Sequence, residues 1–187
     1  MAFKDTILTF NDNKIVESDY SPYNMEVMMD WEVPIMEKSA EYICESKGDI
    51  LEIGFGMGIC SDYIQSQEVN SHTIVEIHPQ VIEKLNIWAE DKSNVTIIEG
   101  DWLSSKISDK YDGIFLDTFG DESWNSFKSF AIAVGKIGTK ITYWNNIPSE
   151  NNEHDFDDIS FEQVSVSADD NSYTNISNTY YMPKVVL

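Results

Sequence analysis

Residues 51–58, which read LEIGFGMG, determine more of the fold than any other stretch of this chain. An apolar run that begins at Ile50 leads into a turn with glycine at every second position, and a helical pattern follows. Glycine has no Cβ, so such a turn lets the backbone approach a ligand closely. We therefore expect a buried strand, a tight turn and a helix that together hold a nucleoside-bearing cofactor.

Strand and helix patterns alternate downstream of this stretch. Strands are expected at 49–53, 73–77, 94–99, 111–117 and 138–144, and helices at 58–67, 79–91 and 123–135. This alternation predicts a mostly parallel sheet covered on both faces. Between Gly100 and Lys110 the chain is too short for a full helix. After Asn146 an acidic stretch precedes two β-type segments, Ile159–Ala168 and Thr179–Val186, which predict a terminal antiparallel pair.

The segment before residue 47 has two parts. Residues 1–22 are polar and turn-rich, which predicts an ordered flap or a loose arm. From Asn24 to about Glu45 apolar residues recur at three- and four-residue steps, which predicts a helix. Pro34 is expected to kink this helix or to start a new one after Glu32.

Composition excludes several classes of partner. The 187 residues fit one domain and carry a formal charge of −21; all twelve basic residues are lysines. A nucleic-acid surface needs a cationic patch and favours arginine, so we expect no nucleic-acid partner and interpret the charge as a solvated acidic surface. No signal peptide or membrane-length apolar stretch is evident. Cys44 and Cys60 are expected to be buried free thiols in a cytoplasmic protein.

Acidic residues at two further strand ends extend the nucleoside site. Glu76 ends the second predicted strand, where a carboxylate accepts hydrogen bonds from ribose hydroxyls. Asp101 and Trp102 follow the third, where an acid and an aromatic ring suit an adenine. NAD and S-adenosylmethionine both bind such a framework. Glu52, the incomplete G-x-G-x-x-G pattern and the terminal strand pair favour S-adenosylmethionine, because Glu52 can hold a cationic amino-acid group.

The motifs resemble a known family in their order along the chain. Segments 51–58, 75–79, 100–102, 116–119 and 142–145 resemble the successive motifs of class I methyltransferases. More narrowly, residues 27–36, VMMDWEVPIM, are similar to the substrate-side segment of guanidinoacetate N-methyltransferase and the related fungal-type protein arginine δ-N-methyltransferase. The resemblance covers about residues 25–145, and Tyr180-Tyr181 fits the family's last strand.

This resemblance implies an α/β, Rossmann-like class I methyltransferase fold. We expect a mostly parallel seven-stranded sheet with an antiparallel C-terminal strand and a reduced C-terminal edge, in a single domain. The expected parts are an N-terminal flap or arm at 1–22, a substrate-side helix at 23–46, a cofactor-binding core at 47–146, and an acidic loop with the terminal strand pair at 147–187.

The resemblance also assigns roles to residues. A guanidinium is planar and cationic and must lose a proton on methylation, so a carboxylate that orients it can also accept that proton. Asp117 is the expected proton acceptor and Glu32 its partner. The expected S-adenosylmethionine contacts are Met28, Met36, Glu52, Gly54, Phe55, Gly56, Met57, Gly58, Glu76, Ile77, His78, Asp101, Trp102 and Asp117. His72, His78 and His154 show no metal-type spacing, so no metal is expected.

We therefore expect an N-methyltransferase, a monomer or homodimer, that acts on a guanidino or other amine nitrogen of a small molecule or an arginine side chain. A catalytically inactive S-adenosylmethionine-binding or protein-interaction module is the alternative, and a nucleotide-dependent oxidoreductase is a third. Glu32 and Asp117 argue against the inactive module. The short C-terminal region argues for it, because only residues 148–158 are available for the family's last crossover helix. No arginine is present to hold a substrate carboxylate, so the sequence does not select guanidinoacetate as the acceptor.

Overall fold

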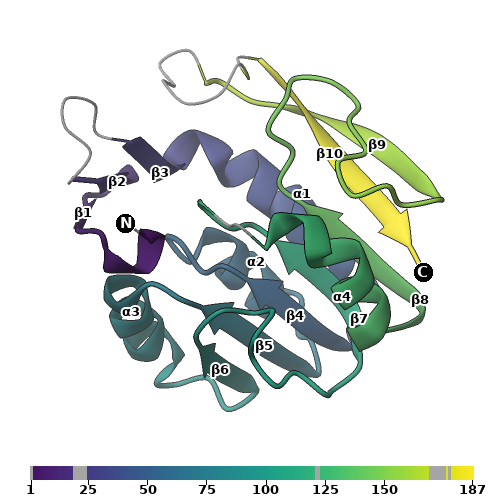
Figure 1. Cartoon of the computed structure of the whole chain (residues 1–187), viewed down its shortest axis with the longest axis horizontal. Coiled ribbons are helices and arrows are strands. Elements are labelled where there is room, and N and C mark those ends of the chain that lie inside the picture. Colours follow the sequence, from purple (N-terminus) through teal and green to yellow (C-terminus); the bar gives the residue numbers. More distant parts are fainter. Residues whose placement is uncertain (1, 19–24, 121–122, 169–175, 177) are drawn as a thin grey trace.

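A seven-stranded sheet forms the centre of the molecule in the computed structural model, which describes residues 2–18, 25–120, 123–168, 176 and 178–187 (Figure 1). Its order is β6-β5-β4-β7-β8-β10-β9. The strands are β4 (Asp49–Ile53), β5 (Ser71–Glu76), β6 (Val95–Glu99), β7 (Tyr111–Leu116), β8 (Gly135–Tyr143), β9 (Ile159–Ser165) and β10 (Thr179–Val186). Strands β4 to β8 pair in parallel, whereas β10 runs antiparallel to both β8 and β9. The predicted sheet and its terminal antiparallel pair are confirmed.

The strand order reverses between β4 and β7. The chain places β5 and then β6 on one side of β4 and returns to place β7 on its other side. In open α/β sheets, ligands bind outside the carboxyl ends of strands at such a switch point. Gly54 follows β4 there and Asp117 follows β7, so the two residues flank this crevice.

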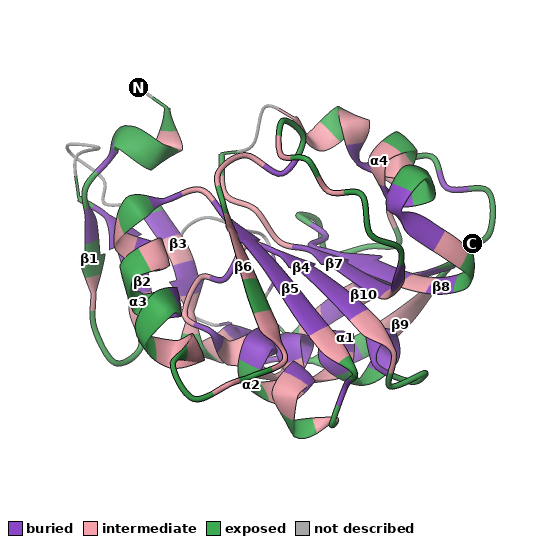
Figure 2. Ribbon diagram, turned by 90° about the horizontal axis from the view of Figure 1, so that it is seen from below, coloured by how far each residue is buried: buried purple, intermediate pink, exposed green. Residues whose placement is uncertain are grey.

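Helices cover the two faces of the sheet unequally. On one face α1 (Val33–Ile43), α2 (Ile59–Ser66) and α3 (Pro79–Ala89) contribute to one core cluster, and on the other α4 (Phe127–Val134) contributes to a second (Figure 2). Successive side chains of β4 point to opposite faces of the sheet, so Ile50 belongs to the first cluster and Leu51 to the second. Residues 100–110 form no helix, as expected. None of the helices in the described ranges is long and apolar enough to span a bilayer.

The N-terminal segment forms a small antiparallel sheet instead of a loose arm. A 3-10 turn, η1 (Phe3–Asp5), precedes β1 (Leu8–Phe10) and β2 (Lys14–Glu17), and β2 pairs with both β1 and β3 (Met25–Met29). The side chain of Gln80 on α3 accepts a hydrogen bond from the Leu8 backbone N–H (2.8 Å) and donates one to its carbonyl (3.0 Å). This pairing with α3 fixes the sheet beside the carboxyl end of β5.

The helix expected from Asn24 begins later than the sequence predicts, and Asn24 itself lies outside the described residues. Residues 25–29 are strand β3, in which Glu26 and Met28 are buried and their neighbours are less so. The apolar residues of this segment recur every three or four positions, as they do in a helix. The segment is nevertheless a strand, because its backbone pairs with β2. The short turn η2 (Asp30–Glu32) follows, and α1 begins at Val33 with Pro34 in its first turn, which confirms the second alternative for Pro34.

The C-terminal region joins the sheet without a crossover helix. Residues 146–158 contain no helix, and β9 and β10 form a hairpin in which Tyr180 pairs with Val164. The Tyr42 hydroxyl on α1 donates to the Val185 carbonyl at 2.8 Å, which fastens β10 to the first helix. The helix expected at 123–135 is shorter, because a 3-10 turn, η3 (Trp124–Ser126), precedes α4 and β8 already begins at Gly135.

Candidate active site

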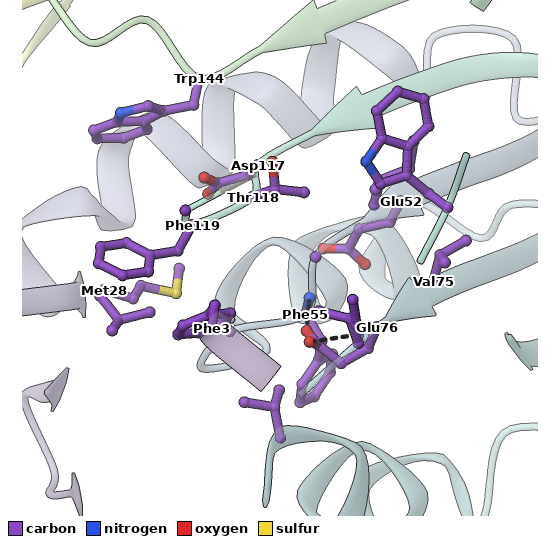
Figure 3. Close-up of a pocket in the computed structure, with 18 of the residues that line it drawn as sticks. Phe3, Met28, Glu52, Phe55, Val75, Glu76, Asp117, Thr118, Phe119 and Trp144 are labelled. Atoms are coloured by element: carbon purple, nitrogen blue, oxygen red, sulfur yellow. Dashed lines mark hydrogen bonds between the residues drawn. The ribbon is translucent and has the colours of Figure 1, made fainter. Parts of the chain in front are cut away.

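A cavity of about 650 Å³ opens at the carboxyl ends of β4 and β7. Its walls come from η1, β3, α1, the residues that follow β4 to β8, and η3. Figure 3 shows Glu52, Glu76 and Asp117 around this space, with Phe119 and Trp144 near Asp117 and Phe3 near Phe55. A volume of this size suits a cofactor or another ligand of drug-like size.

Most of the sequence-predicted site residues meet in this cavity. Both predicted catalytic carboxylates line it, as do ten of the other predicted residues: Met28, Met36, Glu52, Gly54, Phe55, Gly56, Glu76, Ile77, Asp101 and Trp102. These residues come from β3, η2, α1 and the ends of four strands. The fold thus brings together segments that are up to 89 positions apart in sequence, from Met28 to Asp117.

Three predicted cofactor contacts lie outside the cavity lining and shape the turns instead. Gly58 has φ of +77°, and its N–H donates to the Phe55 carbonyl at 2.8 Å as α2 begins. The Met57 N–H lies 3.1 Å from the sulfur of Met28. The His78 ring accepts from the Gln80 N–H at 3.2 Å and caps α3. These contacts shape the turns next to the cavity, and a direct contact of Met57, Gly58 or His78 with the cofactor stays a prediction.

Gly54 joins the two sides of the switch point. Its φ of +94° lies in the region that favours glycine, and a Cβ at this position would lie 1.9 Å from the backbone oxygen of Asp117. The Asp117 N–H in turn donates to the Ile53 carbonyl at 2.9 Å. Glycine at 54 is therefore needed to seat the predicted proton acceptor, in addition to any approach of a cofactor.

Glu76 holds the backbone of both neighbouring turns. Its Oε2 accepts from the Phe55 N–H at 2.9 Å, and its Oε1 accepts from the N–H groups of Ile77 and His78, both at 2.8 Å. Each carboxylate oxygen can accept about two hydrogen bonds, so Oε2 keeps capacity for a ribose hydroxyl. The predicted ribose acceptor thus also fixes the glycine turn, residues 54–58.

Glu52 presents one buried oxygen that has no hydrogen-bond partner within the described part of the chain. The residue is 1% exposed. Its Oε2 accepts from the Ser61 hydroxyl (2.5 Å) and lies 2.9 Å from His72 Nε2, whereas Oε1 has no partner. A buried acceptor without a donor is costly, and an ammonium group supplies the missing donors. The site therefore fits the cationic amino-acid end of S-adenosylmethionine.

The surroundings of Asp117 move its pKa toward neutrality. Burial raises its pKa to about 7, and the negative charges of Glu52 and Glu76 add to this effect. A carboxyl group with a pKa near the working pH accepts a proton efficiently. Glu32 lines the same cavity and is 2% exposed; its Oε1 accepts from the Met29 N–H at 2.9 Å and so holds the β3–η2 junction.

Aromatic residues that the sequence did not place in the site complete the wall. Phe3 of η1 lies with its ring centroid 5.0 Å from those of His78 and Phe119. Trp124 also lines the cavity, and the ring centroid of Trp144 lies 5.3 Å from that of Tyr180. Trp144 directly follows β8 and Phe119 lies three residues beyond the end of β7, and such a position after a strand is a signal in the sequence. No local signal marks Phe3.

The electrostatics of the cavity favour cations. Among the described lining residues there are five carboxylates, Glu32, Glu52, Glu76, Asp101 and Asp117, and one cation, Lys4. Lys4 itself pairs with Asp5 at 2.8 Å. A concave site with acidic walls concentrates cationic ligands.

Comparisons with known proteins agree with this geometry. Residues 9–161 match the model of the guanidinoacetate N-methyltransferase family. Proteins named protein arginine N-methyltransferase 2 are similar to the chain: that of Kluyveromyces lactis is 34% identical over 155 residues, or 76% of this chain and 37% of that protein. That of Yarrowia lipolytica is 37% identical over 147 residues, or 72% of this chain and 30% of that protein. The chain thus spans about a third of the length of these relatives.

Solved structures share the fold at low sequence identity. Spermidine synthase from Thermotoga maritima has a TM-score of 0.64 at 13% identity, over 96% of this chain and 72% of that chain. The N-methyltransferase NodS from Bradyrhizobium japonicum WM9, in complex with S-adenosyl-L-homocysteine, has a TM-score of 0.54 at 13% identity, over 70% of this chain and 65% of that chain. With its class I methyltransferase fold and its match over 9–161, the chain belongs to the guanidinoacetate N-methyltransferase family.

Proposed function

We propose that this protein is an S-adenosylmethionine-dependent N-methyltransferase that acts on a guanidino nitrogen of a small molecule or an arginine side chain. One observation carries the proposal. Asp117, whose pKa is raised to about 7, and Glu32 line the same cavity as the glycine turn. A proton acceptor, a second carboxylate for the guanidinium and a nucleoside site thus meet in one place.

Each part of the cofactor has a partner of suitable chemistry. Glu52 Oε1 would hold the ammonium group, Glu76 the ribose hydroxyls, and Asp101 with Trp102 the adenine. The bound cofactor supplies an activated methyl group on a sulfonium. The protein's task is then to align the acceptor nitrogen and to remove its proton.

Glu32 and Asp117 carry out that task on the acceptor side. Two carboxylates match the paired N–H groups of a planar guanidinium and hold it in one orientation. As the acceptor nitrogen gains the methyl group, it loses a proton, which Asp117 takes up on its carboxylate. Because Asp117 is partly buried, less water competes for its charge, which strengthens its contact with the guanidinium and its attraction for the proton.

The negative charge of the cavity favours methyl acceptors that have no carboxylate close to their guanidino group. The five lining carboxylates would repel such a group, and Lys4 is the sole lining cation in the described ranges. We therefore propose that agmatine, a decarboxylated arginine, or an arginine within a peptide is methylated faster than guanidinoacetate. Free arginine should fall between these, because its ammonium group partly offsets its carboxylate.

A labelled-methyl assay tests the proposal. Wild-type protein is incubated with labelled S-adenosylmethionine and, separately, agmatine, an arginine peptide, arginine, guanidinoacetate and cell extract. Glu32→Gln is the matched variant: it is expected to lower kcat/KM for the best acceptor by about 10–100-fold, as loss of one charge-assisted contact would, with S-adenosylhomocysteine affinity unchanged.

The alternatives predict other outcomes. Protein that binds S-adenosylhomocysteine in calorimetry but labels no acceptor would be an inactive binding module, which the absence of a helix at 146–158 favours. Protein that binds NAD and not S-adenosylhomocysteine would be an oxidoreductase.

We also propose a cytoplasmic location, supported by the two free, buried cysteines, Cys44 and Cys60. Size-exclusion chromatography distinguishes a monomer from a homodimer.

A further inference from the structure

Behind Glu52, a set of buried polar side chains connects the cavity to α2 and β5. Glu52 and Ile50 point to the same face of β4, and His72 of β5 pairs with Ile50 in the parallel register. His72 therefore lies diagonally beside Glu52 on that face. Ser61 and Gln65, four positions apart on α2, contact this pair from above the sheet. We call Ser61, Gln65 and His72 the Glu52 support.

The hydrogen bonds of the support run in one direction. The Gln65 amide nitrogen lies 3.1 Å from His72 Nδ1, so with this amide orientation Nδ1 accepts. Nε2 then carries the proton and donates to Glu52 Oε2 at 2.9 Å. The Ser61 hydroxyl donates to the same oxygen at 2.5 Å. His72 is 0% exposed and Ser61 is 0% exposed, so water does not replace either donor.

This arrangement divides the two oxygens of one carboxylate between two tasks. Oε2 receives both protein donors, whereas Oε1 receives none within the described ranges, and Glu52 lines the cavity. A glutamate held by two donors has lost its rotamer freedom before a ligand arrives, which lowers the cost of binding. The remaining oxygen is a buried acceptor, and a donor that enters the cavity would relieve the cost of its burial.

We propose that His72 and Ser61 are positioning residues that aim Glu52 Oε1 at the ammonium group of the cofactor and set the affinity for the amino-acid end of that ligand alone. The inference rests on the proposed function, because it takes S-adenosylmethionine as the ligand. It adds two residues that touch neither the cofactor nor the acceptor. Their effect is confined to one end of the ligand, whereas a purely structural role would affect every ligand of the cavity.

Two ligands separate these roles. S-adenosylhomocysteine carries the amino-acid end, and 5′-methylthioadenosine has the same nucleoside and thioether without it. Calorimetry with each is done on wild type, Ser61→Ala, His72→Met and His72→Gln. Ser39→Ala is the matched control, because Ser39 is also a buried helix serine (1% exposed) but contacts the sulfur of Met182 instead of Glu52.

The expected result is selective. Ser61→Ala and His72→Met should each weaken S-adenosylhomocysteine binding about 10–100-fold, as expected when a hydrogen bond to a charged group is lost, and leave 5′-methylthioadenosine within about twofold. His72→Gln should restore most of the affinity, since its amide can donate from the position of Nε2. Ser39→Ala should leave both affinities unchanged.

Other outcomes overturn the inference. Equal loss for the two ligands would make the support merely structural, and an unchanged S-adenosylhomocysteine affinity would show that Glu52 needs no positioning. If thermal melting shows that His72→Met does not fold, Ser61→Ala decides the question alone, since it removes one oxygen atom. Wild-type protein that binds neither ligand would refute the proposed function itself. Wild type that binds both ligands equally well would refute only the inference.

Discussion

The two sides of the sheet meet at β7 but are built differently. On the cofactor side, β6-β5-β4, strands and helices alternate along the chain and the turns are fixed by nearby backbone contacts to Glu76. On the acceptor side, β8-β10-β9, the hairpin is held by distant side chains: the Asn145 amide donates to the Tyr181 carbonyl and the Tyr42 hydroxyl to the Val185 carbonyl. Local motifs therefore specify the first side, whereas the second depends on contacts across the fold.

The largest expected effect comes from the residue between the two sides. Asp117→Asn should lower methyl transfer about a thousandfold, within the range for loss of a general base, which is a much larger change than any loss of S-adenosylhomocysteine affinity. Rates and calorimetry with the agmatine acceptor measure this. A variant within tenfold of the wild-type rate would contradict the assignment of Asp117 as the proton acceptor.

Asp117→Asn should stabilise the folded protein although it lowers the rate of methyl transfer. The pKa of Asp117 is raised in the folded state, so the folded protein holds this proton more tightly than the unfolded chain. Stability contributed by the protonated form is therefore lost as pH rises toward 7, and asparagine avoids this loss. Thermal melts of Asp117→Asn should exceed those of wild type, and the gap should widen from pH 5 to pH 7 and then stay constant.

Gly54→Ala tests the joint between the two sides. The new Cβ would overlap the Asp117 backbone oxygen, and φ of +94° is unfavourable for alanine, so unfolding free energy should fall by about 3–5 kcal/mol. Gly138→Ala is the matched control: its φ is +89°, but no atom lies within 4 Å of the added Cβ. Its cost should be about 1–2 kcal/mol. Urea unfolding of both variants measures the difference, and equal costs would show that the close approach does not matter.

Asn145→Ala tests the acceptor side alone. Asn145 is 0% exposed, and its amide donates to the carbonyls of Ser149 and Tyr181, both at 2.9 Å. Removing it should cost about 2 kcal/mol and lower hydrogen-exchange protection in β9 and β10 more than in β4 and β5. Asn152→Ala, which removes only contacts within the acidic segment, should cost less. Uniform loss of protection over all strands would show that the two sides unfold together.

The smallest expected effect is a dependence of rate on pH. With a pKa of about 7, the base form of Asp117 becomes scarce in acid, so kcat/KM should fall about tenfold for each pH unit below 7 and level off above it. Glu32→Gln should keep this profile at a lower rate. A profile that is flat between pH 5.5 and 8 would remove Asp117 from the role of proton acceptor.

Much of the cofactor side was predictable from the sequence, because glycine spacing and acids at strand ends are local signals. The strand at 25–29 was not, since pairing with β2 overrules the helical spacing of its apolar residues. Phe3 reaches the cavity only because the N-terminal sheet docks on α3 through Gln80. His72 looks like an ordinary strand residue until the β4–β5 register places it beside Glu52.

Burial, together with the smaller repulsion from Glu52 and Glu76, raises the pKa of Asp117, so the acidity of this group depends on which ligand the cavity holds. A cation that enters the cavity relieves the repulsion, so the carboxyl of Asp117 gives up its proton to the solution near pH 7. Each binding event then releases a fraction of a proton, and its measured heat varies with the ionisation enthalpy of the buffer. Titration in phosphate and in Tris would count those protons without any methyl transfer. The occupancy of the site by its cationic ligand would thus rise with pH through the neutral range.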